Sequence, residues 1–307
     1  MNMKAPRIYI GVDGGGSKTR VVAVNEHGLE IGRGVAGSSN YRAVGIEQAQ
    51  LAVYAAVQNA GIGQTTVTEA FIGLAGIDTE KDLHVWQPIL QPLATVAHLS
   101  NDAEMLLHVF PAGTAAALVA GTGSIAIART ANGSILRCGG WGHIIGDEGS
   151  GYDLGVRALR AAMAAYDGRE DGTLLMNLIL RRWRLPNVDA LIDYVYSDRC
   201  SKAHIAGIAE TVFDAAMQQD ITAIALIDTA AKQLAAHITG LIRHGLSGPF
   251  SLALGGSLLL QQPKLRETTL EYLRASARIT AIELVYDVAL TVARTAALTH
   301  LVDDFNT

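Results

Sequence analysis

The sequence predicts an α/β fold made of two similar domains, and three observations support that prediction. The chain has 307 residues, which is enough for two domains of ordinary size. Half of the residues are hydrophobic but only 6% are aromatic, so alanine-rich helices and buried aliphatic strands are expected to form the core. A pattern of three strands, with a glycine turn after the first, occurs at residues 8–35 and returns at residues 115–138.

Residues 1–115 are expected to form the first domain. Two runs of β-branched residues, 8–12 and 21–24, flank the first glycine turn and are typical of strands. Apolar residues spaced three and four apart predict a helix over 45–60, which ends at Gly61. The other elements expected here are strands at 30–35, 70–74 and 96–99 and helices at 79–91 and 103–110.

Residues 116–287 are expected to form the second domain. Strands at 115–120 and 125–129 flank a second glycine turn, and Asn132-Gly133 indicates a hairpin leading to a strand at 135–138. Further helices are expected at 152–166, 172–183, 187–195, 202–218, 220–244 and 264–276, with strands at 251–254 and 282–285. A closing segment, 288–307, is expected to be helical and to return to the first domain. The two domains would face a cleft walled by both glycine turns, which is a favoured place for a ligand.

Charge and cysteine content exclude several classes of protein. A net charge of −5 with no basic block argues against a nucleic-acid surface. Two cysteines, Cys138 and Cys200, cannot form a disulfide framework, so a cytoplasmic protein is expected. The N-terminal residues lack the apolar core of a secretory signal. The apolar stretch 112–128 is interrupted by Gly-Thr-Gly and is shorter than the roughly 20 residues of a membrane span, so no membrane partner is expected.

The first glycine turn has the composition of a phosphate-binding loop. It contains three glycines, two hydroxyl side chains and a lysine: Gly14, Gly15, Gly16, Ser17, Lys18 and Thr19. Successive backbone N–H groups in such a turn form a concavity that binds anions. Asp13 precedes the turn and would repel a bare phosphate. Because Mg²⁺ prefers a carboxylate together with phosphate oxygens and water, we expect Asp13 to lie near a magnesium ion.

Two commoner glycine motifs do not fit this turn. A Walker motif needs Lys directly after the second spaced glycine, whereas Ser17 precedes Lys18 here. A dinucleotide-binding motif needs glycine where Thr19 stands and a helix after it, whereas a strand follows. An ordinary hairpin turn with spare glycines remains the alternative.

Six motifs in a fixed order resemble one family. They are VDGGGSKT at 12–19, GSSN at 37–40, ND at 101–102, GTGS at 121–124, GGWGHIIGDEGSGYDLG at 139–155 and LGGS at 254–257. Together they resemble the N-acetylglucosamine kinase and BadF/BadG/BcrA/BcrD ATPase family of the sugar kinase, Hsp70 and actin superfamily. The resemblance implies two ribonuclease H-like domains of the actin/hexokinase type, which face an interdomain cleft.

The resemblance also implies roles for single residues. It implies that the second turn binds phosphate and that the LGGS turn packs against adenosine, and these nucleotide-binding residues are Gly121, Thr122, Gly123, Ser124, Gly255, Gly256 and Ser257. Asn40, Asp102 and Asp147 match positions that bind sugar hydroxyls, and Asp102 matches the catalytic base. Gly142 would let the backbone approach the sugar. The alternatives are local: Asp102 and Asp147 as helix caps and Asn40 as a turn residue.

The activity implied by the resemblance is phosphorylation of an amino sugar. ATP and Mg²⁺ would act in an in-line transfer to the O6 hydroxyl of N-acetylglucosamine or glucosamine, with an Asp as base. N-acetylmuramic acid is an alternative substrate, and a sensor that binds sugar without turnover is another reading. A third alternative is a BadF-type ATPase activator, whose iron–sulfur cluster needs four thiolates, here two copies of Cys138 and Cys200. The expected partners are an amino sugar and a second copy of the chain in a homodimer.

Overall fold

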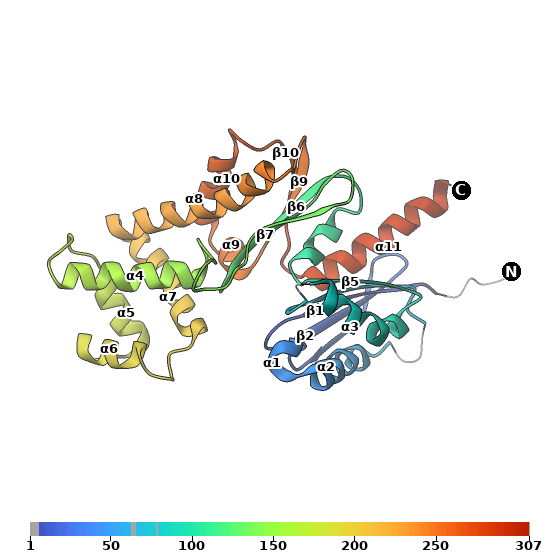
Figure 1. The fold of residues 1–307 in the computed structure, drawn as a ribbon, viewed down its shortest axis with the longest axis horizontal. Coiled ribbons are helices and arrows are strands. Elements are labelled where there is room, and N and C mark those ends of the chain that lie inside the picture. The colour runs from blue at the N-terminus through green and yellow to red at the C-terminus, as the bar shows by residue number, and fades with distance from the viewer. Residues whose placement is uncertain (1–5, 63–65, 78, 307) are drawn as a thin grey trace. The chain divides into compact units, whose positions relative to one another are not determined.

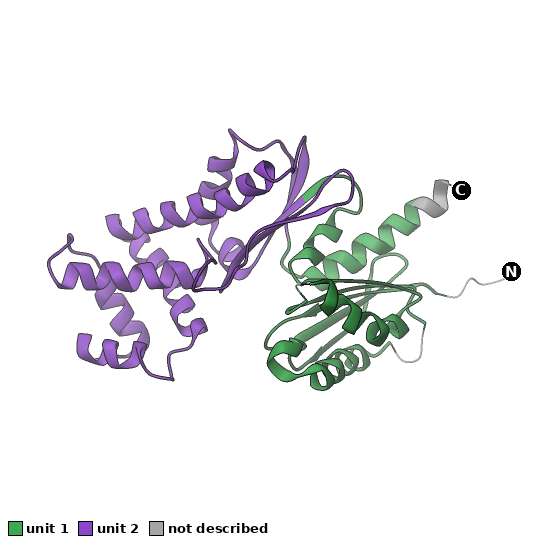
Figure 2. Ribbon diagram, in the orientation of Figure 1, with its two compact units in different colours: residues 1–115, 285–307 green, residues 116–284 purple. Residues whose placement is uncertain are grey.

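The structure is a computed structural model that describes residues 6–62, 66–77 and 79–306. The chain divides into two compact units (Figure 2). Unit 1 contains residues 1–115 and 285–307, and unit 2 contains residues 116–284. Each unit has a five-stranded sheet covered by helices (Figure 1), which confirms the predicted α/β fold.

The sheet of unit 1 is mixed and has the order β3-β2-β1-β4-β5. Its strands are β1 (Ile8–Gly14), β2 (Thr19–Asn25), β3 (Glu30–Ala36), β4 (Glu69–Leu74) and β5 (Val96–Ser100). β1 pairs antiparallel with β2 and parallel with β4, which in turn pairs parallel with β5. The carboxyl ends of β1, β4 and β5 therefore share one edge of the sheet, where ligands of open α/β sheets bind.

Unit 1 also contains helices, several of which pack against this sheet. They are α1 (Tyr41–Val44), α2 (Ile46–Asn59), α3 (Glu80–Leu90) and α11 (Val288–Asn306), with 3₁₀ segments η1 (Gln91–Leu93) and η2 (Glu104–Val109). A Cβ atom at Gly11 of β1 would lie 2.0 Å from the carbonyl oxygen of Ala289 in α11. Glycine at this position therefore lets the last helix lie directly against the central strand of unit 1.

The sheet of unit 2 repeats the arrangement of the first. Its strands are β6 (Ala115–Ala120), β7 (Ser124–Arg129), β8 (Ile135–Gly139), β9 (Phe250–Gly255) and β10 (Ile279–Leu284). Their order, β10-β9-β6-β7-β8, equals that of unit 1 when β6 takes the place of β1. β7 and β8 are antiparallel, and β9 and β10 are parallel. The repeated sequence pattern is thus a repeated topology.

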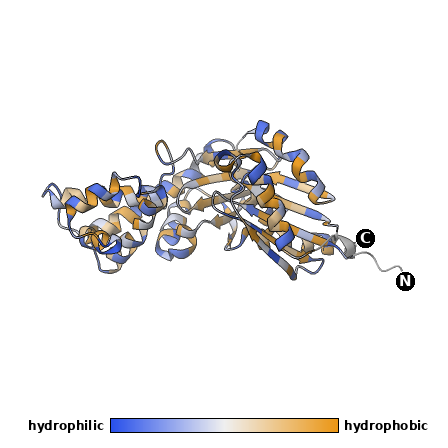
Figure 3. Cartoon of the chain, turned by 90° about the horizontal axis from the view of Figure 1, so that it is seen from below, coloured by the Kyte–Doolittle hydropathy of each residue, from blue (hydrophilic) through white to orange (hydrophobic). Residues whose placement is uncertain are grey.

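The helices of unit 2 supply most of its core. They are α4 (Gly151–Tyr166), α5 (Leu175–Trp183), α6 (Val188–Val195), α7 (Lys202–Met217), α8 (Ile221–Arg243), α9 (Ser257–Gln261) and α10 (Pro263–Leu273). Their small and aliphatic residues form the buried core, and hydrophobic and hydrophilic residues are interspersed along the helices of the chain (Figure 3), as expected for helices with one buried face. None of the helices in the described residues is long and apolar enough to cross a bilayer.

Several elements differ from the sequence prediction. Residues 104–109 form a 3₁₀ segment, and the helix expected at 172–183 begins only at Leu175. The last strand is 279–284 instead of 282–285. Two helices of four and five residues, α1 and α9, had not been expected. Elements so short show no apolar periodicity, because a periodic pattern needs at least two or three turns to be visible.

Candidate active site

The first glycine turn is tied to the loop that follows β3. Within the turn, Gly15 N–H donates to the carbonyl of Lys18 at 2.9 Å. The Thr19 hydroxyl donates to the carbonyl of Gly37 at 2.8 Å, and the Ser38 hydroxyl donates to the carbonyl of Gly15 at 3.3 Å. The predicted phosphate loop and the GSSN segment are therefore one hydrogen-bonded assembly.

Two glycines of this turn serve different purposes. A Cβ at Gly14 would lie 2.2 Å from the hydroxyl of Ser39, which is fully buried, so this glycine permits close packing. No atom lies within 4 Å of a Cβ placed at Gly16, so the backbone there has open space beside it. Gly16, Ser17 and Lys18 are exposed and can present N–H, hydroxyl and ammonium groups to an anion.

Asp13 lies in β1 just before the turn, with its side chain 25% exposed and 3.3 Å from the guanidinium of Arg20. Burial raises the pKa of its carboxyl, and the charges of Arg20 and Lys18 oppose that rise. Further positive charge nearby would stabilise the ionised form of a carboxylate in this position. No cluster of three or more His, Cys, Asp or Glu side chains suited to a metal exists among the residues that the structure describes. Asp13 fits Mg²⁺ nevertheless, since that ion commonly binds one carboxylate, phosphate oxygens and water.

Asp102 follows β5 at the same sheet edge. A Cβ at Gly73 of β4 would lie 3.2 Å from the Asp102 Cα, so this glycine lets the turn after β5 lie against β4. Asn101 fixes the turn by donating to the carbonyl of Ile77 at 3.1 Å and accepting from the N–H of Ala103 at 2.8 Å. The Asp102 carboxylate accepts from the same N–H at 3.0 Å. The N-cap position of the 3₁₀ segment that follows is Ala103, one residue after Asp102.

Asn40 is the N-cap of α1, and its side-chain oxygen accepts from the N–H of Arg42 at 3.2 Å. A Cβ at Gly76, where φ is +93°, would lie 2.8 Å from that oxygen. The turn or cap role foreseen as an alternative for Asn40 is therefore present. The side-chain amide N–H₂ group remains the part of Asn40 that can recognise a ligand.

The loop after β4 joins the three site segments of unit 1, and the sequence had given no sign of this. Its Ala75 N–H donates to the carbonyl of Gly14 at 2.7 Å. Gly76 packs on Asn40, and Ile77 accepts the bond from Asn101 described above. The first glycine turn, Asn40 and the Asn101–Asp102 turn are therefore held at one sheet edge by a single short loop.

The second glycine turn is fixed by the start of α4. Gly121 N–H donates to the carbonyl of Gly123 at 2.9 Å within the turn. Gly151 N–H donates to the carbonyl of Gly121 at 2.8 Å, and Tyr152 N–H donates to the carbonyl of Thr122 at 3.2 Å. The first amides of α4 are thus used by the turn itself. Any anion at this turn would be bound by the turn and not by the end of that helix.

Asp147 lies against the second turn. It is 5% exposed and has a φ of +60°, a conformation that is uncommon for a residue other than glycine. A Cβ at Gly123 would lie 2.8 Å from one of its carboxylate oxygens. The Lys202 ammonium lies 2.8 Å from the same carboxylate. Sequence reasoning missed Lys202, because its only local feature is its place as the first residue of α7.

Gly139 at the end of β8 and Gly142 in the loop after it have different surroundings. At Gly139 a Cβ would lie 2.9 Å from the ring of His237, so this position admits an imidazole and not a ligand. His237 is buried, which lowers its pKa, and it lies 3.3 Å from the hydroxyl of Ser124. Gly142 has a φ of +86° and open space around its Cα. Trp141 is 62% exposed, with the guanidinium of Arg137 4.6 Å from its ring centre.

The turns after β6 and β9 share one pocket of about 180 Å³. A Cβ at Gly256, where φ is +83°, would lie 2.3 Å from the carbonyl oxygen of Ala120, so glycine brings the two strand ends together. Residues of the α7 helix form the opposite wall. The lining residues used below are Gly121, Thr122, Ser257, Ala203, Ala206, Gly207, Glu210, Gln261 and Gln262. The predicted second phosphate turn and LGGS turn therefore lie side by side in unit 2.

The two cysteines do not have the setting of cluster ligands. A Cβ at Gly240 of α8 would lie 2.5 Å from the sulfur of Cys138, so this thiol is packed between β8 and α8. Burial raises the pKa of both thiols, Cys138 and Cys200. A raised pKa favours the neutral thiol over the thiolate that a metal needs.

An α/β chain with two repeated sheets, each with a glycine turn after its first strand, has the architecture of the actin and hexokinase type. The chain belongs to the BadF/BadG/BcrA/BcrD ATPase family, whose model matches residues 10–288. The resemblance inferred from the six motifs is thereby confirmed.

Curated relatives with similar sequences are amino-sugar kinases. The chain is 32% identical over 239 residues to an N-acetylmuramic acid/N-acetylglucosamine kinase of Clostridium acetobutylicum, covering 74% of this chain and 77% of the relative. It is 31% identical over 246 residues to an N-acetyl-D-glucosamine kinase of Dictyostelium discoideum, covering 73% and 76%. A glucosamine kinase of Vibrio cholerae is 27% identical over 236 residues, covering 75% and 77%.

Solved structures confirm the fold. A candidate N-acetylglucosamine kinase from Chromobacterium violaceum matches with a TM-score of 0.74 and 27% identity, covering 95% of this chain and 99% of the other. A ROK family glucokinase from Streptomyces griseus matches with a TM-score of 0.55 and 18% identity, covering 95% and 98%. The second match is evidence for the shared sugar-kinase fold alone.

Proposed function

We propose that this protein transfers the γ-phosphate of ATP to the O6 hydroxyl of an amino sugar, N-acetylglucosamine or glucosamine. One observation carries the proposal. The turn after β6 and the LGGS turn after β9, which are far apart in the sequence, line a single pocket in unit 2. Their backbone N–H groups suit the phosphates of a nucleotide, and the adjoining wall of α7 suits its ribose and base. The relatives, all kinases of amino sugars, supply the substrate class.

Unit 1 would supply the base and the first glycine turn, which would bind phosphate from its own side. Phosphoryl transfer depends mainly on in-line positioning and on stabilisation of charge. The sugar hydroxyl must lose its proton as its oxygen bonds to the γ-phosphorus and the bond to the leaving ADP breaks, and a carboxylate within reach can accept that proton. We assign this role to Asp102, because the sheet edge that carries it also carries Asp13 and the first glycine turn.

Magnesium would be held by Asp13. When bound, the ion would neutralise charge on the phosphate oxygens. Lys18, exposed in the turn, would add positive charge on the same side.

Sugar recognition is assigned to Asn40, Asp102, Gly142 and Asp147. The oxygen of Asn40 caps α1, so its N–H₂ group would donate to a sugar hydroxyl. Asp147 already pairs with Lys202, and a sugar hydroxyl would have to donate to a carboxylate oxygen beside that pair. The open backbone at Gly142 would allow a ligand to approach closely.

N-acetylmuramic acid is a second candidate substrate, favoured by the name of the relative from Clostridium acetobutylicum. It differs from N-acetylglucosamine by a lactyl ether on O3 and leaves O6 unchanged, so the same transfer could act on both. The choice between them depends on the space beside O3 and not on the transfer chemistry.

A screen for ADP release tests the proposal. The purified chain would be given ATP and Mg²⁺ with N-acetylglucosamine, glucosamine, N-acetylmuramic acid, N-acetylmannosamine or glucose. We expect release only with sugar, and fastest with one of the first three. ADP release that is equal with and without sugar would instead favour an ATPase.

A further inference from the structure

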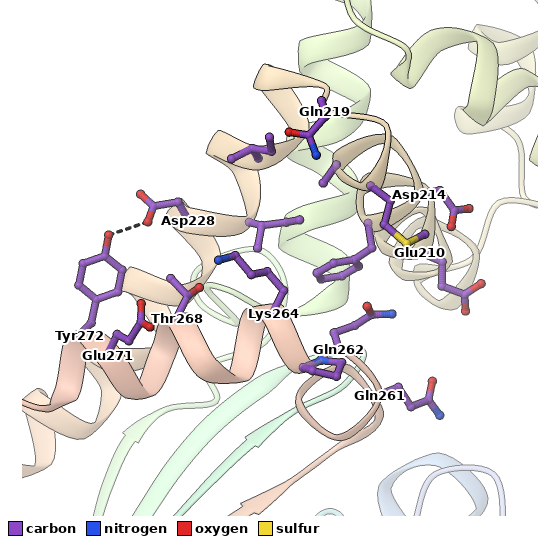
Figure 4. A pocket seen from close by; sticks show the side chains of 16 residues that line it. Glu210, Asp214, Gln219, Asp228, Gln261, Gln262, Lys264, Thr268, Glu271 and Tyr272 are labelled. Atoms are coloured by element: carbon purple, nitrogen blue, oxygen red, sulfur yellow. Dashed lines mark hydrogen bonds between the residues drawn. The ribbon is translucent and has the colours of Figure 1, made fainter.

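A groove of about 1150 Å³ lies beside the pocket assigned to the nucleotide (Figure 4). Its walls are the carboxyl-terminal half of α7, the first half of α8 and the segment that includes α9 and α10. Every residue that lines it belongs to unit 2.

The groove and the nucleotide pocket adjoin each other. Glu210, Gln261 and Gln262 line both of them. The smaller pocket is also lined by Gly121, Thr122 and Ser257 of the two turns. A nucleotide with its phosphates at the glycine turn would therefore direct its base toward Gln261 and Gln262, and the far edge of the base would face the groove.

The groove is larger than a base requires. Sites for small organic ligands have volumes of about 300–1,000 Å³, so a purine ring at its mouth would leave most of this space available. Phe213 and Ile227 form a buried apolar floor, and Met217 is 74% exposed at the rim. These walls suit an uncharged aromatic or aliphatic group.

Charged groups surround this floor, and several already have partners. Asp228 accepts from the Tyr272 hydroxyl at 2.6 Å (Figure 4) and pairs with Lys232 at 2.8 Å. Glu210 pairs with Arg182 at 2.8 Å. Among the described residues, the lining carries four carboxylates and a single lysine, Lys264, around the apolar floor, and this excess of negative charge does not favour a second phosphate.

We infer that this groove extends the nucleotide site and accepts an apolar group carried on the far edge of the base. The donor class is therefore wider than ATP and includes nucleoside triphosphates with a bulky substituent on the exocyclic amine. The inference rests on the proposed kinase function and concerns only which nucleotides serve it.

The test compares ATP with N6-benzyl-ATP as donors at saturating amino sugar, with the phosphorylated sugar measured by mass spectrometry. We expect the KM values of the two donors to agree within about threefold, because the benzyl group enters the groove without displacing the base. A loss of kcat/KM above about 100-fold with N6-benzyl-ATP, while ATP remains active, would overturn the inference and leave the kinase proposal intact. Failure of both donors with every sugar would count against the kinase proposal itself.

Groove-filling variants locate the binding of the benzyl group. Thr268→Trp and Met217→Trp place an indole in the groove from α10 and α7, and Met217 is exposed enough to tolerate the change. We expect each to raise the KM for N6-benzyl-ATP by about tenfold while changing that for ATP by less than about twofold. Glu267→Trp is the matched control, since Glu267 is exposed on α10 and does not line the groove. Equal effects on both donors, or an equal effect of the control, would contradict the inference.

Discussion

The ammonium of Lys202 lies 2.8 Å from the carboxylate of Asp147. This pair joins the first residue of α7 to the loop before α4, and the same carboxylate packs against Gly123 of the second glycine turn. One ion pair therefore links the turn assigned to phosphate with the helix that lines the pocket assigned to the nucleoside.

Removal of the Lys202 ammonium should destabilise unit 2. Lys202→Met leaves the carboxylate of Asp147, only 7% exposed in its side chain, without its partner. Because Lys202 is itself 35% exposed, we expect a loss of about 1–3 kcal/mol in the free energy of unfolding, less than for a fully buried pair. Urea unfolding of Lys202→Met, Asp147→Asn and the double variant gives the coupling energy. A coupling below about 0.3 kcal/mol would mean that the pair has no structural role.

The elements built from local signals could be predicted from the sequence. Runs of β-branched residues next to glycines predict strand, turn and strand without knowledge of the rest of the chain. The repeated topology of the two sheets follows from the same signals occurring twice. Long amphipathic helices such as α7 and α8 show their period over several turns, and their ends in the structure lie close to the predicted ones.

What the sequence could not predict depends on contacts between distant residues. Lys202 and Asp147 are 55 residues apart, and nothing in either segment indicates the other. The loop 75–77 binds Gly14, Asn40 and Asn101 only because β4 lies between β1 and β5. The role of Gly139 depends on His237 from another helix. Each of these relationships is set by packing and not by a local pattern.

Substitution of the proposed base should act on turnover and not on sugar binding. Asp102→Asn keeps the shape of the side chain but removes its ability to accept a proton, and general-base catalysis typically contributes about 10²–10⁴-fold. We expect kcat to fall by at least about 100-fold, while calorimetry shows sugar affinity within about threefold of the original. Asp189→Asn, an exposed position in the first turn of α6, is the control. A rate near that of the unmodified protein would exclude Asp102 as the base.

Asp13 should determine the magnesium requirement. Its burial and its position at the end of β1 leave it suited to bind a cation in addition to Arg20. For Asp13→Ala we expect the Mg²⁺ concentration at half-maximal rate to rise by about tenfold or more, since the carboxylate is the ligand that the protein offers. The measurement is a magnesium titration at fixed ATP and sugar. An unchanged midpoint would show that the metal binds elsewhere.

Asp82 should act on sugar binding through α1. It is 6% exposed and accepts hydrogen bonds from Tyr41 and, at 3.0 Å, from Arg42, the two residues that follow Asn40. Weakening these bonds would loosen α1 and with it the side chain assigned to the sugar. For Asp82→Asn we expect the sugar KM to rise by about tenfold with the nucleotide KM unchanged, together with a stability loss of about 1–3 kcal/mol.

A comparison with Tyr41→Phe distinguishes positioning from general stability. This variant removes one bond to Asp82 and retains the ion pair with Arg42, so its effect on the sugar KM should be smaller. If both variants lower the melting temperature but leave the sugar KM unchanged, Asp82 has only a structural role.

The stabilising contribution of Asp220 to unit 2 should be lost in acid. Burial would raise the pKa of its carboxyl, but hydrogen bonds from the N–H groups of Leu174 and Ala223 and from the Thr173 hydroxyl lower it overall. A carboxyl whose pKa is lower in the folded protein stabilises it above the unfolded pKa of about 3.9, and this contribution is lost as the pH falls through the folded-state pKa. Asp220→Asn should therefore cost about 1–3 kcal/mol at pH 7, because the amide nitrogen cannot accept the bonds from Leu174 and Thr173, and progressively less below about pH 4. Thermal unfolding of both proteins across this range gives the difference, and a difference that does not change with pH would show that the charge of Asp220 contributes nothing.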